Sequence, residues 1–153
     1  MGEKFSSILI ATDGSQHTKN AVKHGLALAK LSNAKVYAVY VIDIAAFTSI
    51  PLDATWENMH EFLKKEGEAA IKSVEEDAAS QGIKIEKIIL EGNPAQEIVK
   101  FASANNIDLI VMGTLGKSGL ERFLLGSVAE KVIRTASCPV MVVRSQVAES
   151  RER

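Results

Sequence analysis

The stretch Val111–Val128, V-M-G-T-L-G-K-S-G-L-E-R-F-L-L-G-S-V, decides how the rest of this chain is interpreted. It overlaps the apolar run from Ile107 to Met112, which predicts a buried strand. Gly113 and Gly116 follow this run directly. Glycine at a strand exit lets the backbone turn sharply and approach a ligand, because no Cβ stands in the way. The stretch therefore predicts a strand that ends in a tight turn beside an open space.

The end of the same stretch predicts the N-terminus of a helix. Gly126 and Ser127 open a helical pattern that continues to Thr135. Free amide groups and the positive end of a helix dipole suit a phosphate at such a terminus. Ser127 and Glu130 also fit a capping box, in which Ser127 would serve only to begin the helix. The two interpretations are compatible, and with the glycine turns they supply the parts of a nucleotide site.

Strand and helix patterns alternate along the rest of the chain. We expect strands at 6–12, 35–42, 83–90, 108–112 and 139–144, and helices at 18–31, 56–79, 94–105 and 127–135, with a looser segment at 43–55. Short connections between such units predict an α/β fold, a parallel sheet with helices on both faces. Residues 1–145 are expected to form one nucleotide-binding domain, and 146–153 a polar tail. These patterns do not give the order of the strands.

Several residues predict where helices begin and end. Asn93, Pro94 and Gln96 are typical of an N-cap, a proline at the first helical position and a capping-box glutamine. Gly82 fits a left-handed cap after the long helix.

The segment A-T-D-G-S at 11–15 ends the first strand. An Asp-Gly turn with Ser15 as the N-cap of the first helix accounts for Gly14 and Ser15. Asp13 has a second possible role, because its carboxylate can accept hydrogen bonds from a ribose. Ligands of open α/β sheets bind beyond the carboxyl ends of the strands, where the strand order reverses. If the first and fourth strands are neighbours, Asp13 and Gly113 line one crevice.

Composition excludes several classes of function. The 153 residues carry a formal net charge of −1, so the chain lacks the basic field that holds a nucleic-acid backbone. Its apolar runs are far shorter than a membrane span, and its first residues do not fit a signal peptide. The single cysteine, Cys138, excludes an internal disulfide and suits a reducing compartment. We expect a cytoplasmic protein with no membrane segment and no nucleic-acid partner.

No group of side chains in the sequence predicts a catalytic centre. His17, His24 and His60 lack the spacing of a metal site, and the first two are expected on a solvated helix face. Lys117 and Arg122 lie between the glycines, where each one either contacts a phosphate or remains a solvated loop charge. We therefore expect binding without catalytic residues and without a metal site built by the protein.

These motifs resemble those of the universal stress proteins, in particular the branch that binds ATP. The resemblance covers nearly the whole chain, through I-L-I-A-T-D-G-S at 8–15, the central stretch, and C-P-V-M-V-V-R at 138–144. The ATP-binding signature of that branch is glycine, two residues, glycine, nine residues, then glycine and serine or threonine. Gly113, Gly116, Gly126 and Ser127 satisfy it in full.

The resemblance implies a five-stranded sheet in the order 3-2-1-4-5, which makes the first and fourth strands neighbours. It also implies an ATP site, with Mg²⁺ arriving on the nucleotide. In that site Thr12 and Asp13 border the adenosine, with Asp13 on the ribose, and the backbone of Val41 holds adenine. The remaining implied residues are Met112 and Gly113 beside base and ribose, and Gly116, Gly126, Ser127 and Val128 around the phosphates.

The resemblance further implies a homodimer formed through the last strand, Val140–Val143, whose apolar edge would otherwise invite aggregation. The expected function is nucleotide-dependent signalling in stress physiology through a protein partner that the sequence does not identify. Two alternatives are a weak ATPase or autophosphorylating enzyme and a nucleotide-free interaction dimer. Leu115 and Ala129 depart from family members that carry histidine and threonine there, which removes two possible polar contacts.

Overall fold

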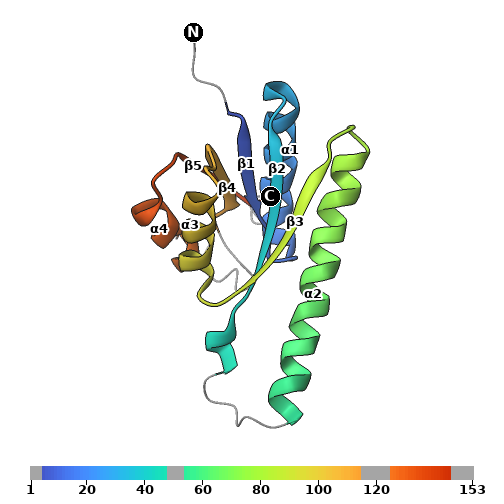
Figure 1. Cartoon of the computed structure of the whole chain (residues 1–153), viewed down its shortest axis with the longest axis vertical. Coiled ribbons are helices and arrows are strands. Elements are labelled where there is room, and N and C mark those ends of the chain that lie inside the picture. The colour runs from blue at the N-terminus through green and yellow to red at the C-terminus, as the bar shows by residue number, and fades with distance from the viewer. Residues whose placement is uncertain (1–4, 48–53, 115–124, 146–153) are drawn as a thin grey trace, which may run out of the picture.

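Five parallel strands form one sheet in a computed structural model that describes residues 5–47, 54–114 and 125–145 (Figure 1). The strands are β1 (Ser7–Ala11), β2 (Lys35–Ile42), β3 (Ile85–Glu91), β4 (Leu109–Gly113) and β5 (Val140–Val143). Their order across the sheet is β3-β2-β1-β4-β5, and every neighbouring pair is parallel. The α/β class and the order 3-2-1-4-5 are thereby confirmed. The expected tail 146–153 lies outside the described residues.

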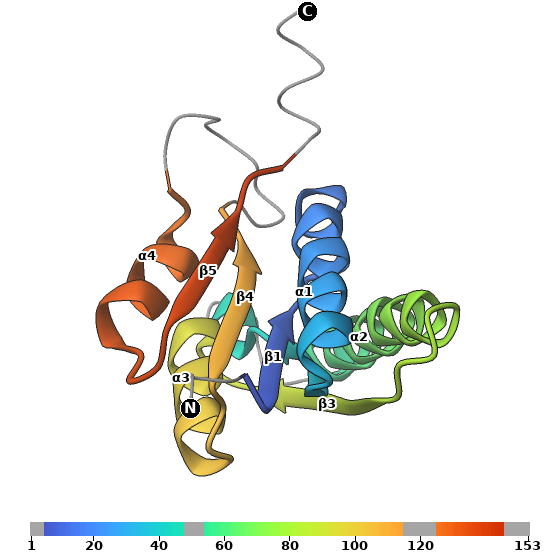
Figure 2. The same ribbon diagram turned by 90° about the horizontal axis from the view of Figure 1, so that it is seen from above.

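Helices cover both faces of the sheet (Figure 2). One face carries α1 (Lys19–Ser32) and α2 (Ala54–Ala79), and the other carries α3 (Pro94–Ala104) and α4 (Ser127–Thr135). Short 3₁₀ turns, η1 (Gln16–Thr18) and η2 (Ile44–Phe47), follow β1 and β2. In the described residues no helix has the length and apolar character needed to span a membrane.

The central strands are almost wholly apolar because both of their faces are buried. In β1, Ile8 and Ile10 pack under α1 and α2, whereas Leu9 packs under α3 and α4. All three side chains are fully buried. On the α3 side, the Phe101 and Tyr37 rings meet edge to face with 5.5 Å between their centroids.

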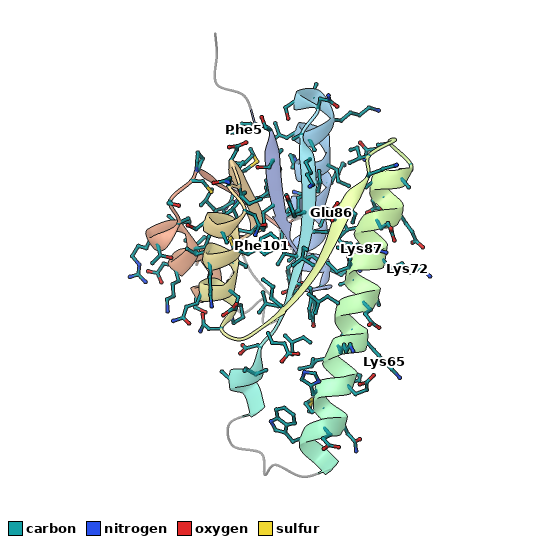
Figure 3. All side chains as sticks on the ribbon, viewed as in Figure 1. Phe5, Lys65, Lys72, Glu86, Lys87 and Phe101 are labelled. Carbon is teal, nitrogen blue, oxygen red and sulfur yellow. The ribbon has the colours of Figure 1, made fainter. Side chains whose placement is uncertain are left out.

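The long helix α2 has one buried and one solvated face. Figure 3 shows Lys65 and Lys72 on its outer side, pointing away from the sheet. Its inner side approaches β2 so closely that a Cβ on Gly67 would lie 2.7 Å from the Tyr40 ring. A salt bridge of 3.3 Å joins Glu75 to Lys87 on β3. These contacts fix α2 over the β2–β3 half of the sheet.

Most predicted boundaries agree with the structure within two residues, but two predicted caps are wrong. Ser15 does not cap α1: it precedes η1, and its hydroxyl donates instead to Asp13 Oδ1 at 2.6 Å, a stronger charge-assisted bond. Ser127 does not cap α4, because the N-cap is Gly126 and Ser127 is already helical. The looser segment predicted at 43–55 contains η2 and the first residues of α2.

Two other boundary predictions are confirmed. Asn93 caps α3, since its side-chain oxygen accepts a 3.0 Å hydrogen bond from the Gln96 amide. Gly82 adopts a left-handed φ of 75° in the turn after α2.

Candidate functional site

A cavity of about 400 Å³ opens at the carboxyl ends of β1, β2 and β4. The strand order reverses here, because β1 lies between β2 on one side and β4 on the other. The wall includes eight of the predicted binding residues: Thr12, Asp13, Val41, Met112, Gly113, Gly126, Ser127 and Val128. The ninth, Gly116, lies outside the described residues, as do Leu115, Lys117 and Arg122. The crevice expected between Asp13 and Gly113 is therefore present, and the roles of these residues remain predictions.

The wall at the end of β1 is a network of side-chain hydrogen bonds. Asp13 Oδ1 accepts from the Ser15 amide at 2.9 Å and from the Ser15 hydroxyl at 2.6 Å. The Thr18 hydroxyl lies 3.4 Å from the same oxygen and 3.3 Å from the hydroxyl of Thr12, which accepts from the Gly14 amide. Thr12 and Thr18 are buried. The carboxylate is thus held in one orientation at the edge of the cavity.

The wall at the end of β2 presents backbone groups. β1 ends at Ala11, which is in register with Val39, and the Thr12 amide donates the last hydrogen bond to the Val39 carbonyl at 3.0 Å. Along a parallel strand, alternate residues turn their N–H and C=O groups toward the same neighbour. Val41 therefore directs its amide and carbonyl toward β1, two residues beyond the point where β1 has turned away. Both groups face the cavity.

The wall at the end of β4 is the start of α4. The Gly126 amide donates to the Thr114 carbonyl at 2.7 Å, which places the helix N-terminus beside the exit of β4. Gly126 is the N-cap, and no side chain in the described part of the chain caps the helix. The first amides of the helix, on Ser127, Val128 and Ala129, precede the first internal helical bond, from Glu130 to Gly126. This terminus is suited to an anion.

Residues outside the predicted binding set complete the cavity. They are the apolar Ala11, Val39, Leu63, Pro94, Ile98 and Ala129, the aromatic Tyr40, and the polar Thr18, Asp43 and Thr114. Leu63 on α2 and Ile98 on α3 also belong to the apolar clusters that pack these helices on the sheet, and no local sequence signal distinguishes them from other core positions. Only the packing of those helices brings them to the carboxyl ends of the strands. Thr114 could have been added to the predicted binding residues from the sequence alone, because it directly follows Gly113.

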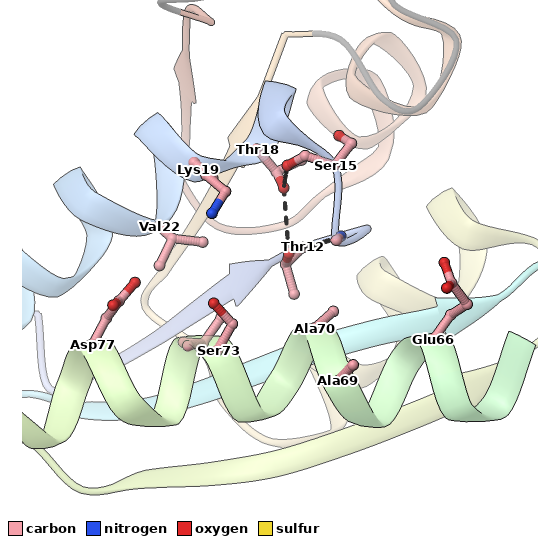
Figure 4. Close-up of a pocket in the computed structure, with 12 residues that line it drawn as sticks. Thr12, Ser15, Thr18, Lys19, Val22, Glu66, Ala69, Ala70, Ser73 and Asp77 are labelled. Carbon is pink, nitrogen blue, oxygen red and sulfur yellow. Dashed lines mark hydrogen bonds between the residues drawn. The ribbon is translucent and has the colours of Figure 1, made fainter.

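A second, smaller cavity of about 200 Å³ lies between α1 and α2 (Figure 4). Thr12 and Thr18 line both cavities, so their paired hydroxyls form a shared wall. The polar residues around its rim, Lys19, Glu66, Ser73 and Asp77, are exposed. It is an open groove rather than an enclosed site.

The histidines and the cysteine considered in the sequence do not line the larger cavity. His17 is half-buried, with its Nδ1 3.3 Å from the Ser145 hydroxyl, so the expected solvated position is wrong for it. His24 is exposed as expected, and His60 pairs with Glu91 at 2.9 Å. Among the described residues, no three His, Cys, Asp or Glu side chains are placed to hold a metal ion. Burial and the charge of Asp108 raise the pKa of the Cys138 thiol, which lies before β5 and away from the cavity.

Comparison with known proteins identifies relatives of the same size and architecture. The model of the universal stress protein family matches residues 4–144. Universal stress protein MJ0531 of Methanocaldococcus jannaschii is 50% identical over 145 residues, which cover 95% of this chain and 85% of that protein. The solved structure of universal stress protein UspA from Lactobacillus plantarum superposes with a TM-score of 0.86 at 26% identity, covering 94% of this chain and 100% of that one. A universal stress protein crystallised in complex with cAMP superposes with a TM-score of 0.70 at 25% identity, covering 94% and 99%.

Proposed function

We propose that this chain, which belongs to the universal stress protein family, binds ATP in the larger cavity and acts as a cytoplasmic regulatory dimer in stress response. The observation that carries the proposal is the composition of the cavity wall. Among the described residues, one side offers a fixed carboxylate, another the Val41 peptide with no backbone partner on β1, and the third a helix start with no side-chain cap. These three features suit a sugar, a base and a phosphate chain, in that order.

The peptide of Val41 supports adenine as the base. Its N–H can donate to a ring nitrogen of adenine, while its C=O accepts from the exocyclic amine. Guanine presents a donor and an acceptor in the reverse order, so it would leave both groups of the peptide unpaired. A site built for hydrogen bonds discriminates strongly against a ligand that leaves them unmade. The relative crystallised with cAMP, which also carries adenine, supports the same base.

The start of α4 supports a phosphate chain. The amides at the start of α4 lie beside Gly113 and Gly126, where the absence of side chains lets a ligand approach the backbone. The cavity volume of about 400 Å³ is in the range of small-molecule sites. Mg²⁺ would arrive on the phosphates, as this ion usually does, without a protein cage.

Occupancy of this site would act by shifting a population of conformations rather than by chemistry. A nucleotide that contacts the ends of β1, β2 and β4 favours whichever surface conformation it binds more tightly. The size of the shift is limited by the difference in affinity between the two states. A protein partner that distinguishes those states would read the signal.

A calorimetric titration of nucleotide-free protein with Mg-ATP tests the proposal, with AMP and GTP as comparators. We expect ATP to bind with a Kd below about 1 mM, a binding free energy of about −4 kcal/mol or better, and GTP to give no signal. Absence of ATP binding, or equal binding of GTP, would contradict it. Gly126→Val serves as the control, and a phosphate-release assay on both proteins separates slow hydrolysis from contaminating ATPase.

The edge of the sheet supports the proposed dimer. In the described part of the chain β5 is an edge strand that pairs with β4 alone, and its side chains, Val140 to Val143, are all half-buried. The Thr114 amide bonds to the Val143 carbonyl and the Ile110 amide to the Pro139 carbonyl, so the Val142 peptide faces outward. Val142→Pro would remove that outward N–H and spare the ladder with β4. Light scattering should then show a 16.5 kDa monomer, while Val142→Thr, which keeps the N–H, remains a dimer.

A further inference from the structure

All hydrogen bonds from described residues to the Asp13 carboxylate go to one of its two oxygens. Oδ1 accepts from the amide and hydroxyl of Ser15 and lies within 3.4 Å of the Thr18 hydroxyl. No described residue donates to Oδ2. A carboxylate held at one oxygen cannot rotate freely, so its other oxygen has a fixed direction.

Ser15 acts on Asp13 from outside the nucleotide cavity. It lines the groove between α1 and α2, as Figure 4 shows, and not the cavity that Asp13 lines. Thr18 stands between the two spaces and is buried. Its hydroxyl lies 3.1 Å from the Ser15 carbonyl and 3.3 Å from the Thr12 hydroxyl, so it ties the Ser15 turn to the end of β1.

We propose that Ser15 and Thr18 are positioning residues that set the preference of the nucleotide site for ribose over deoxyribose. This inference rests on the proposed function. With Oδ1 occupied, Oδ2 accepts a hydrogen bond from a ribose hydroxyl without first losing rotational freedom. A sugar that lacks this hydroxyl gains nothing from the orientation. We call the hydrogen bonds from Ser15 and Thr18 to Oδ1 the clamp. Loss of the clamp should therefore weaken ATP binding and leave binding of the deoxy analogue nearly unchanged.

The test is the ratio of Kd values for deoxy-ATP and ATP, measured by calorimetry with both the 2′-deoxy and the 3′-deoxy analogue. In the native protein, at least one analogue should bind about tenfold more weakly than ATP, as expected for one hydrogen bond to a charged group. In Ser15→Ala, ATP should bind roughly fivefold more weakly, with that analogue changing by less than about twofold. Thr18→Val, which replaces the hydroxyl with a methyl of the same shape, should lower the same ratio.

Two further variants separate this role from general damage. Ser73→Ala removes a hydroxyl from the same groove without a described contact to Asp13, so the ratio should stay at its native value. Ser15→Thr keeps a hydroxyl at the position and should retain most of the preference. Thermal unfolding of each variant, followed by circular dichroism, identifies any that fails to fold, and Ser15 is open enough for its alanine variant to remain informative.

The outcomes distinguish the clamp from the site itself. ATP binding by the native protein with an unchanged ratio in Ser15→Ala would overturn the clamp and leave the proposed function standing. Equal losses for ATP and both deoxy analogues would also overturn it, because they indicate a structural role only. Failure of the native protein to bind any adenine nucleotide would overturn the proposed function together with the clamp.

Discussion

Helices α3 and α4 begin at the same cavity and pack on the same face of the sheet, yet their first turns differ. In α3, Pro94 has no amide hydrogen, and the Gln96 amide bonds to the Asn93 side chain. In α4, the N-cap is Gly126, which has no side chain to offer. The first helix terminus is closed by a side chain of the protein, whereas no described side chain closes the second.

This difference shows how the N-cap residue determines whether the first amides of a helix can bind a ligand. Capping by a side chain stabilises a helix by about 1 kcal/mol, and a glycine N-cap forgoes only a few tenths of that. The chain gives up little stability at α4 and keeps amide groups available to a ligand. The phosphate end of the proposed site is therefore assigned to α4 rather than α3.

Adding a side-chain cap to the N-terminus of α4 should produce the largest effect on ATP affinity. Gly126→Asp supplies a good cap, which should preserve or slightly raise the melting temperature, but it also places a carboxylate where the phosphates are proposed to bind. We expect ATP affinity to fall by about a hundredfold, or roughly 3 kcal/mol. Calorimetry and thermal unfolding measure the two effects, which have opposite signs.

A neutral cap and shorter nucleotides sharpen this test. Gly126→Asn also caps the helix but adds no charge, so its effect on ATP should be smaller than that of Gly126→Asp. The loss caused by aspartate should decrease from ATP to ADP to AMP, because repulsion grows with phosphate charge. Equal losses for all three nucleotides would mean that α4 does not face the phosphates.

A substitution at Asp13, which is proposed to contact the ribose, should have an intermediate effect on ATP affinity. This effect should not depend on the first turns of α3 and α4. Asp13→Asn replaces the carboxylate with a neutral amide, which weakens any hydrogen bond from a ribose. We expect about tenfold weaker binding, consistent with one bond to a charged group, and the same factor for ATP, ADP and AMP. A factor that varied with phosphate number would place Asp13 near the phosphates and erase the contrast with α4.

Removing the side-chain cap of α3 should lower stability and leave ATP affinity nearly unchanged. Asn93→Ala removes the cap on the Gln96 amide, which should cost about 1 kcal/mol of unfolding free energy. For a chain of this size that corresponds to a melting temperature lower by about 3 °C. ATP affinity should remain within about twofold of the native value, because the α3 terminus is not proposed to hold phosphate. A large loss of affinity would show that both helices contribute.

The smallest effect of bound nucleotide is expected at Cys138, which lies beyond the C-terminal end of α4. Only the thiolate reacts with iodoacetamide, and burial together with Asp108 raises the pKa of this thiol. Alkylation near neutral pH should therefore be slower than for a free cysteine, with its rate still rising where the free thiol has levelled off. Asp108→Asn should shift that profile to lower pH. Mg-ATP should not alter the rate, and protection by nucleotide would mean that its effect spreads along the whole helix.

Sequence patterns predicted the elements of the fold more reliably than the chemistry at their ends. Alternating apolar runs predicted each strand and helix, and the order of the strands came from the family resemblance. The caps were predicted less well, because serine is a good cap wherever nothing competes for it. At Ser15 the competing partner was the Asp13 carboxylate, and at Ser127 the helix began at the predicted residue, so that Gly126 took the N-cap position instead. Leu63 and Ile98 reach the cavity through helix packing, which no local pattern contains.

The hydrogen bond from the Gly126 amide to the Thr114 carbonyl has a consequence for the spacing of the glycines in the signature. It joins the two ends of segment 115–125, so the start of α4 is set by β4 and does not depend on the length of the segment between them. The entropy of closing a loop grows only slowly with its length. The placement of α4 therefore does not by itself require a fixed number of residues in that segment, and the nine-residue spacing between Gly116 and Gly126 is better explained by the phosphate contact proposed for Gly116.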